Sequence, residues 1–159
     1  MFENFVLSWL RSDSLPKQTL ASKMLTLYLE NEKSSFEKRL PSCLPLISEQ
    51  LDPDRYESLK SGEKHNNDLA KDEDNLLFQH FNFLFKLLKM ETGKNLIVKN
   101  KFQNHINQIL AYVVSTYLLH PHVWIRGICV QIFGQIFSWF DPESFGQLSG
   151  VSLNILTFF

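Results

Sequence analysis

The sequence predicts an all-α fold built from antiparallel helix pairs, and three observations carry this prediction. Apolar residues recur at helical spacing through most of the chain, most regularly over residues 125–140. Little of the chain before its last residues alternates apolar and polar side chains as a half-buried strand would. Prolines beside capping residues, as in residues 12–16 and 120–126, divide the chain into pieces of helical length.

Residues 1–51 are predicted to form a set of N-terminal helical repeats. The apolar residues of 2–10 share one helical face, and residues 12–16 end this helix and begin the next. A further apolar stripe runs over residues 36–51, interrupted by Pro41 and Pro45. Because each proline removes a helical hydrogen bond, we expect a kink or a split there.

Residues 52–74 are predicted to be a disordered acidic linker. They contain eight acidic and four basic side chains, with very few apolar ones. Such a segment buries too little apolar surface to offset the loss of chain entropy on folding. We interpret it as a solvated loop in preference to a regulatory or partner-binding segment, and expect the next helix to follow Asp74.

Residues 75–149 are predicted to form further helical repeats. The helix after Asp74 is apolar on more than one side, which is typical of a helix packed between two neighbours. The last long helix contains Gly127 and Gly134, which lie off its main apolar stripe. A glycine inside a helix costs about 1 kcal/mol relative to alanine, so we expect a neighbouring helix to approach closely there, with an unselected weak point of the helix as the alternative.

A turn separates the last two helices of this region and has the sequence His120-Pro121-His122-Val123-Trp124-Ile125-Arg126. Proline suits a turn and a helix entry. Val123 and Ile125 are expected to anchor the entry to the core, and Arg126 to reach carbonyl groups or an acidic group. Trp124 is expected to seal the turn, with nucleic-acid stacking or partner binding as the alternative.

This turn is similar to that of HEAT repeats, which have a proline followed by a small apolar residue and an arginine near the start of the second helix. The structural repeat turn would consist of Pro121, Val123, Trp124 and Arg126. The full string, continued by Gln131-Ile132-Phe133-Gly134, resembles the HEAT-repeat family of small-subunit processome component 20. The resemblance is best over residues 75–145.

The resemblance implies a HEAT-like α-solenoid of antiparallel helix pairs, with 52–74 as a long disordered insertion. It implies a non-catalytic scaffold in the nucleus and nucleolus, acting in pre-rRNA processing and ribosome biogenesis within the small-subunit processome. Its partners would be other proteins of a large pre-ribosomal assembly, with a contact to pre-rRNA or small nucleolar RNA as a further possibility. Family members are much longer, so we expect a fragment whose residues 150–159 form an irregular apolar tail.

The sequence predicts neither an enzyme nor a cofactor site. It lacks a glycine-rich phosphate loop, an HExxH or GxSxG motif, and a paired Cys/His arrangement. His120 and His122 stand without a nearby ligand cluster, so we expect turn histidines and not a metal site. Cys43 and Cys129 lie on apolar stripes and are expected to be buried thiols in a reducing compartment.

The composition also bounds the partners. A net charge of −1 gives no general attraction to nucleic acid. The only basic concentration surrounds the loop before residue 102, where Lys94, Lys99 and Lys101 are candidate phosphate contacts, although a solvated face is the simpler interpretation. The most apolar stretch, 127–140, is too short to cross a bilayer, so no membrane contact is expected. Because the sequence contains no catalytic or phosphate-binding motif, no small-molecule substrate is expected either. The alternative function is a HEAT/armadillo-type protein-binding adaptor in transport or signalling.

Overall fold

The computed structural model describes residues 2–32, 36–55, 67–91, 93, 95 and 103–139. Within these ranges the chain consists of helices joined by short turns and contains no strand, which confirms the predicted all-α class. The elements in chain order are α1 (Phe2–Leu10), α2 (Leu15–Asn31), the 3₁₀ helix η1 (Glu37–Arg39), α4 (Leu40–Gln50), α6 (Asn67–Leu88), α8 (Gln103–Ser115), the 3₁₀ helix η2 (Tyr117–Leu119) and α9 (Val123–Phe137).

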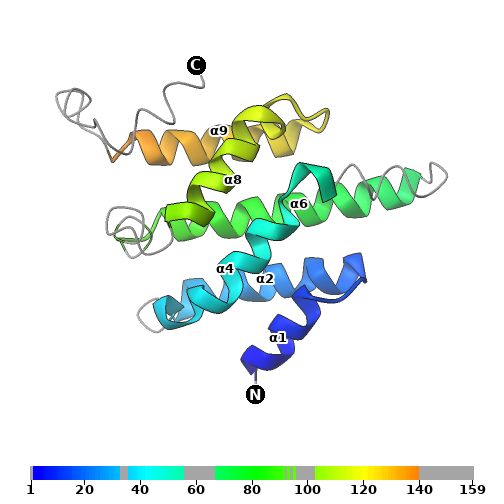
Figure 1. Cartoon of the computed structure of the whole chain (residues 1–159), viewed down its shortest axis with the longest axis vertical. Coiled ribbons are helices and arrows are strands. Elements are labelled where there is room, and N and C mark those ends of the chain that lie inside the picture. Colours follow the sequence, from blue (N-terminus) through cyan, green and yellow to red (C-terminus); the bar gives the residue numbers. More distant parts are fainter. Residues whose placement is uncertain are drawn as a thin grey trace.

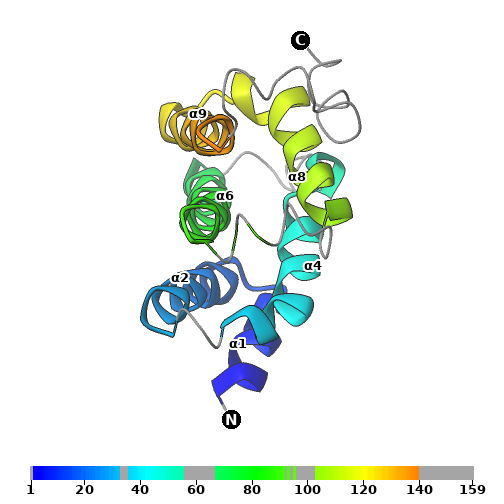
Figure 2. The ribbon, with the colours of Figure 1, turned by 90° about the vertical axis from the view of Figure 1, so that its left-hand side faces the viewer.

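The helices form two layers (Figures 1 and 2). One layer contains α2, α6 and α9, stacked one above another and running in the same direction along the chain. The other layer contains α1, α4 and α8, which cross the first layer at an angle. The helices pack antiparallel to their neighbours along the chain, and the main contacts are those of α6 with α2 and α9 and of α1 with α2.

The helix boundaries follow from local sequence chemistry. Ser14 has an extended backbone before α2, and Pro16 occupies the first turn of that helix, where a missing N–H costs nothing. Pro41 similarly lies at the start of α4, so the predicted split of the 36–51 stripe occurs between η1 and α4. Pro45 lies inside α4 without ending it.

A single hydrophobic core runs through the stack and joins residues from every α-helix. Two pairs of aromatic rings in this core involve α6. The ring of Phe83 lies 5.8 Å from that of Phe36, and the ring of Phe81 lies 5.1 Å from that of Tyr117. The Tyr117 hydroxyl donates a 2.8 Å hydrogen bond to the Leu51 carbonyl, 66 residues earlier. The segments predicted as separate N- and C-terminal repeats therefore share one core.

The predicted disordered linker over 52–74 is wrong at both of its ends. Residues 53–55 are helical, and α6 begins at Asn67 instead of after Asp74. Acidic side chains in the first turns of a helix interact favourably with its macrodipole, so a polar segment can be helical without being buried on all sides. Even there Glu73 is buried. Residues 56–66 lie outside the described part of the chain.

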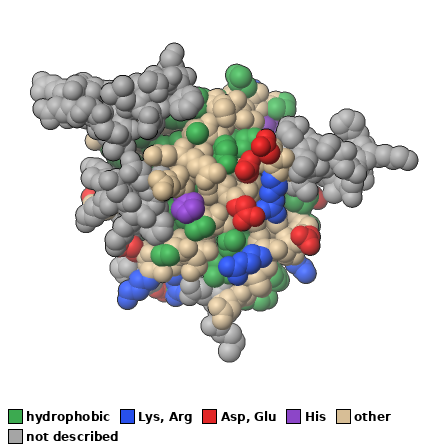
Figure 3. Space-filling model, in the orientation of Figure 1, with side chains coloured by type: hydrophobic (Ala, Val, Ile, Leu, Met, Phe, Trp, Pro, Cys, Tyr) green, Lys and Arg blue, Asp and Glu red, His purple; other side chains and the backbone are tan. Residues whose placement is uncertain are grey.

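The remaining predictions about composition can be placed in the same way. Cys43 and Cys129 are both buried free thiols, as expected. No helix in the described ranges combines the length and hydropathy of a membrane span. On the face shown in Figure 3, Lys and Arg side chains are interspersed with Asp and Glu and do not form a patch of one sign. Residues 140–159, including the predicted tail, lie outside the described part of the chain.

Candidate functional site

The turn between α8 and α9 is built by side chains that satisfy its backbone. His120 Nδ1 accepts a 3.1 Å hydrogen bond from the His122 amide, and His122 Nδ1 caps α9 by accepting a 3.3 Å bond from the Trp124 amide. Arg126 Nη1 donates to the carbonyls of His120, at 2.6 Å, and Pro121, at 2.7 Å. The predicted reach of Arg126 to carbonyl groups is confirmed, and both turn histidines are engaged in the backbone of the turn.

The entry of α9 is anchored differently from the prediction. Ile125 is fully buried, but Val123 is 60% exposed and therefore does not anchor the helix. Trp124 is 68% exposed, with its ring 6.3 Å from that of Phe78 and 5.5 Å from that of His122. Trp124 therefore covers the turn only in part, through its ring contacts with Phe78 and His122. Val123 and Trp124 lie in the same turn as Ile125 but on other sides of the helix, and only the side of Ile125 faces the core.

We expect replacement of Arg126 by alanine to lower the free energy of unfolding by about 1–2 kcal/mol, because two charge-assisted hydrogen bonds are lost from a partly buried site. Alanine and arginine have similar helix propensities, so the helix itself is little affected. Urea denaturation followed by circular dichroism measures the change. The matched control is Gln131→Ala on the exposed side of α9, expected within about 0.5 kcal/mol of the unmodified protein. Equal effects of the two variants would contradict this role.

The outer side of α9 carries uncharged, mostly apolar side chains that are partly exposed. Val123, Val130 and Phe137 follow each other at seven-residue spacing and are 60%, 61% and 36% exposed. Gly127 and Gly134 lie between them, and a Cβ added to either would meet nothing within 4 Å. The predicted close approach of a neighbouring helix at these glycines is therefore wrong within the described structure. We call these five residues the α9 end stripe.

Because nothing touches the two glycines, alanine should fit at both positions. We expect Gly127→Ala and Gly134→Ala each to raise the free energy of unfolding by about 0.5–1 kcal/mol, the helix-propensity difference. Thermal denaturation at low protein concentration measures it. A loss of stability in either variant would contradict this, because it would mean that another part of the same chain occupies the space beside the glycine.

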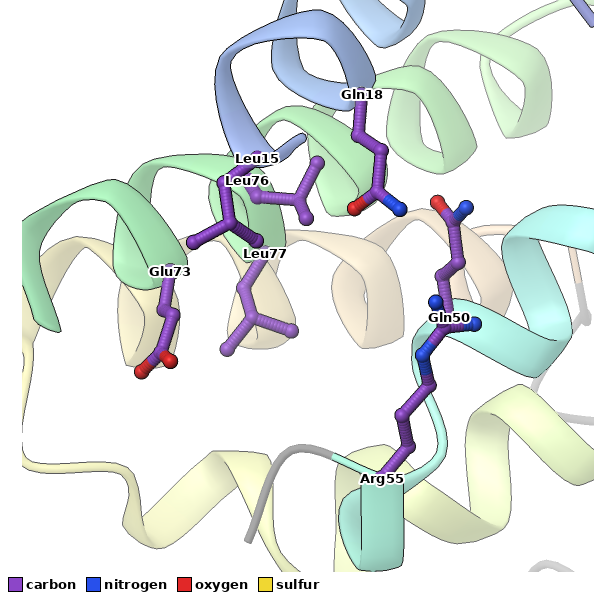
Figure 4. Close-up of a pocket in the computed structure, with 7 residues that line it drawn as sticks. All are labelled: Leu15, Gln18, Gln50, Arg55, Glu73, Leu76 and Leu77. Carbon is purple, nitrogen blue, oxygen red and sulfur yellow. The ribbon is translucent and has the colours of Figure 1, made fainter. Parts of the chain in front are cut away.

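A small pocket lined by both polar and apolar side chains lies where α2, α4 and α6 meet. Its volume of about 20 Å³ is enough for a single water molecule, not for an organic substrate. Figure 4 shows the carboxamides of Gln18 and Gln50 turned toward each other, with Arg55 extending toward Gln50 and Glu73 across the opening. Gln50 Nε2 donates to the Leu10 carbonyl, whereas its buried Oε1 has no hydrogen-bond partner in the described structure. The pocket is therefore suited to hold a structural water.

A second buried polar pair joins α2 to α6. Ser22 Oγ and His80 Nδ1 lie 2.5 Å apart, both side chains are fully buried, and His80 Nε2 has no partner in the described structure. Burial, with a smaller contribution from the positive charge of Arg55, lowers the pKa of His80 to about 3. The imidazole is therefore neutral at physiological pH. The Ser22–His80 pair is a buried polar contact that joins α2 to α6.

The two cysteine thiols are also buried. Burial raises the pKa of the Cys129 thiol to about 12, which keeps it protonated and unreactive. No three His, Cys, Asp or Glu side chains gather as potential metal ligands within the described ranges. The candidate phosphate contacts Lys94, Lys99 and Lys101 fall outside those ranges.

Two further lysines, Lys86 and Lys89, precede these residues in the sequence and lie in the described part of the chain. Both have local contacts. Lys86 lies 2.7 Å from Glu30 of α2, and Lys89 lies over the Phe85 ring. Among the described residues, the α9 end stripe is therefore a more distinctive exposed surface than these lysines.

No known protein-family model matches the chain.

Proposed function

We propose that the chain is a non-catalytic helical-repeat scaffold of the HEAT type, which acts through its surfaces. The observation that supports this proposal is the arrangement of the antiparallel helices in two layers, with α2, α6 and α9 running in one direction in the first layer. In α-solenoids each repeat packs mainly on its neighbours and presents extended surfaces to partners. The carbonyl contacts of Arg126 support the HEAT-like interpretation of the turn.

The surface chemistry favours protein partners. The α9 end stripe contains no charged residue, and exposed aromatic and aliphatic side chains are characteristic of the centres of protein interfaces. Direct contact with pre-rRNA or small nucleolar RNA would fall to Lys94, Lys99 and Lys101, since phosphate binding requires cations. Trp124 is exposed enough to stack on a base or to enter a partner's pocket.

We further propose that this scaffold belongs to the small-subunit processome and acts in pre-rRNA processing in the nucleolus. The residues that support this are those of the turn and of Gln131-Ile132-Phe133-Gly134, through their resemblance to that family. The alternative is a HEAT/armadillo-type adaptor in transport or signalling. An adaptor would share the helical stack and the apolar stripe, so the two functions differ only in their partners and location.

The tagged chain, expressed in cells and purified after mild cross-linking, tests the assignment. We expect nucleolar localisation and enrichment of small-subunit precursor rRNA over mature rRNA. A charge-neutralising triple variant at Lys94, Lys99 and Lys101 should weaken recovery of RNA but not of proteins if these residues contact RNA directly. Exclusion from the nucleus, with recovery of transport or signalling proteins and no precursor rRNA, would favour the adaptor and contradict the processome assignment.

A further inference from the structure

The two glutamines of the pocket between α2, α4 and α6 are oriented by backbone carbonyls. Gln18 Nε2 donates a 2.5 Å hydrogen bond to the Ser12 carbonyl, and Gln50 Nε2 donates to the Leu10 carbonyl. A carbonyl oxygen only accepts hydrogen bonds, so the group that faces it must be the nitrogen of each carboxamide. These partners therefore determine which way each carboxamide is turned.

The two carboxamides face each other without a direct hydrogen bond. In Figure 4 the nitrogen of Gln18 lies on the side toward Gln50, and the oxygen of Gln50 lies on the side toward Gln18. Gln50 is 9% exposed, and its Oε1 accepts no hydrogen bond within the described structure. The bond to Ser12 uses only one of the two N–H groups of Gln18 Nε2. A donor and an acceptor therefore face each other across the pocket.

The size of the pocket limits what can lie between these groups. Its volume of about 20 Å³ exceeds the roughly 10–15 Å³ that one water molecule needs, and it leaves no room for an organic ligand. Leu15, Leu76 and Leu77 form apolar walls, so the polar side chains must hold the occupant. A buried water needs two or more polar partners, and the two carboxamides supply them.

The charges around the pocket favour a neutral occupant. Arg55 extends toward Gln50, so its guanidinium group repels a metal cation. Glu73, which is buried on the other side of the opening, repels an anion. A cation has no lone pair to accept from Gln18, and a simple anion has no hydrogen to donate to Gln50. A water molecule can do both.

We propose that one internal water molecule occupies this pocket, donating to Gln50 Oε1 and accepting from Gln18 Nε2. Because Gln18 also binds the Ser12 carbonyl and Gln50 the Leu10 carbonyl, the water completes a polar link between α2, α4 and the connection from α1 to α2. It is a constituent of the fold at the point where the first three α-helices meet. This inference goes beyond the proposed function and does not depend on it.

Overhauser effects between water and the side-chain amide protons of the ¹⁵N-labelled full chain test the proposal. Laboratory-frame and rotating-frame effects have opposite signs for a bound water, and equal signs for surface water or chemical exchange. We expect opposite signs at the amide protons of Gln18 and Gln50. Gln131, exposed on α9, is the internal control and should not show them. The effect should persist in Ser12→Ala, which removes a nearby hydroxyl proton and keeps the carbonyl.

A pair of matched variants tests the role of Gln50. Gln50→Met has a side chain of similar length without the acceptor, so the water effect at Gln18 should be lost. Gln131→Met makes the same change at an exposed position and should leave that effect intact. If Gln50→Met fails to fold, a high-resolution crystal structure of the unmodified chain decides, with electron density expected between the two carboxamides.

Several results would overturn the proposal. One is equal signs, or no effect, at both glutamines of the unmodified chain. Another is a crystal structure with an empty pocket and a direct Gln18–Gln50 hydrogen bond. A water effect that survives in Gln50→Met would exclude Gln50 as its ligand. A midpoint of unfolding that rises with sodium or potassium chloride but not with choline chloride would indicate a bound cation in place of water.

Discussion

The free energy of unfolding of the chain should fall steeply as the pH is lowered from about 6.5 toward about 3, and His80 should account for much of this loss. The side chain is fully buried, accessible neither to water nor to a counter-ion, and its pKa in the folded state is about 3. In the unfolded chain the imidazole has its ordinary pKa of about 6.5. Between these values the unfolded state binds a proton that the folded state excludes.

The sign of the effect follows from this difference. A base whose pKa is lowered by folding contributes fully to stability above its unfolded pKa, and the contribution is lost as the pH falls through the window between the two values. The full shift corresponds to a loss on the order of 4 to 5 kcal/mol. This is a large fraction of the stability of an ordinary domain.

The double variant Ser22→Ala with His80→Leu isolates this contribution. It removes both polar partners from the α2–α6 contact, so no unsatisfied group is left behind, and stability at neutral pH should be similar or higher. Denaturant titrations at several pH values should show a much flatter acid limb. His105→Gln, at a half-buried position of α8, is the control and should keep the steep limb. Identical pH profiles for the double variant and the unmodified chain would rule out His80 as the cause.

Replacement of Phe81 by alanine should lower the free energy of unfolding by about 3–5 kcal/mol, the usual result of emptying an aromatic site in a core. The side chain is fully buried in α6, and its ring packs edge-on against Tyr117. Tyr117 in turn holds the end of α4 through the Leu51 carbonyl. The cavity would therefore weaken the contacts among three helical segments at once.

Denaturant unfolding measured by circular dichroism and by tryptophan fluorescence should give one coincident transition at a lower midpoint. The matched control is Phe78→Ala, three residues earlier in the same helix, which is only partly buried and touches the edge of Trp124. Its effect should be clearly smaller. A loss below about 1 kcal/mol at Phe81 would contradict a shared core, since even modest core truncations usually exceed that value.

The sequence predicted the α9 core face well because strong periodicity carries its own register. Ile125, Ile128, Cys129, Ile132, Phe133 and Ile136 are all buried, as their spacing indicates. Phe137, which the same spacing places on the core face, is 36% exposed, and Phe140 lies outside the described residues. The same periodicity says nothing of the opposite face: Gly127 and Gly134 suggested a close neighbour, but no such neighbour lies within reach in the described structure. Whether an apolar residue is covered depends on what stands beside it, which the helix alone does not specify.

Polar residues account for the other failures. The early turns of α6 were predicted to be disordered because apolar side chains are scarce there, yet charged residues near a helix start can be helical through the macrodipole and local propensity. The Ser22–His80 contact could not be predicted, since it joins residues 58 apart through helix packing. Gln18 and Gln50 carry no motif, and only the meeting of α2 and α4 gives them a shared pocket.

The position of α6 between α2 and α9 also determines the order in which the helices should exchange their amide protons. Amide protons exchange with solvent only when a helix opens, and opening α6 requires its separation from both α2 and α9, the two most extensive helix contacts in the described structure. The central turns of α6 should be the last to exchange deuterium, with protection decreasing toward both ends of the stack. Fraying from the ends would then be the ordinary fluctuation of this fold, and whatever covers either end would slow it throughout.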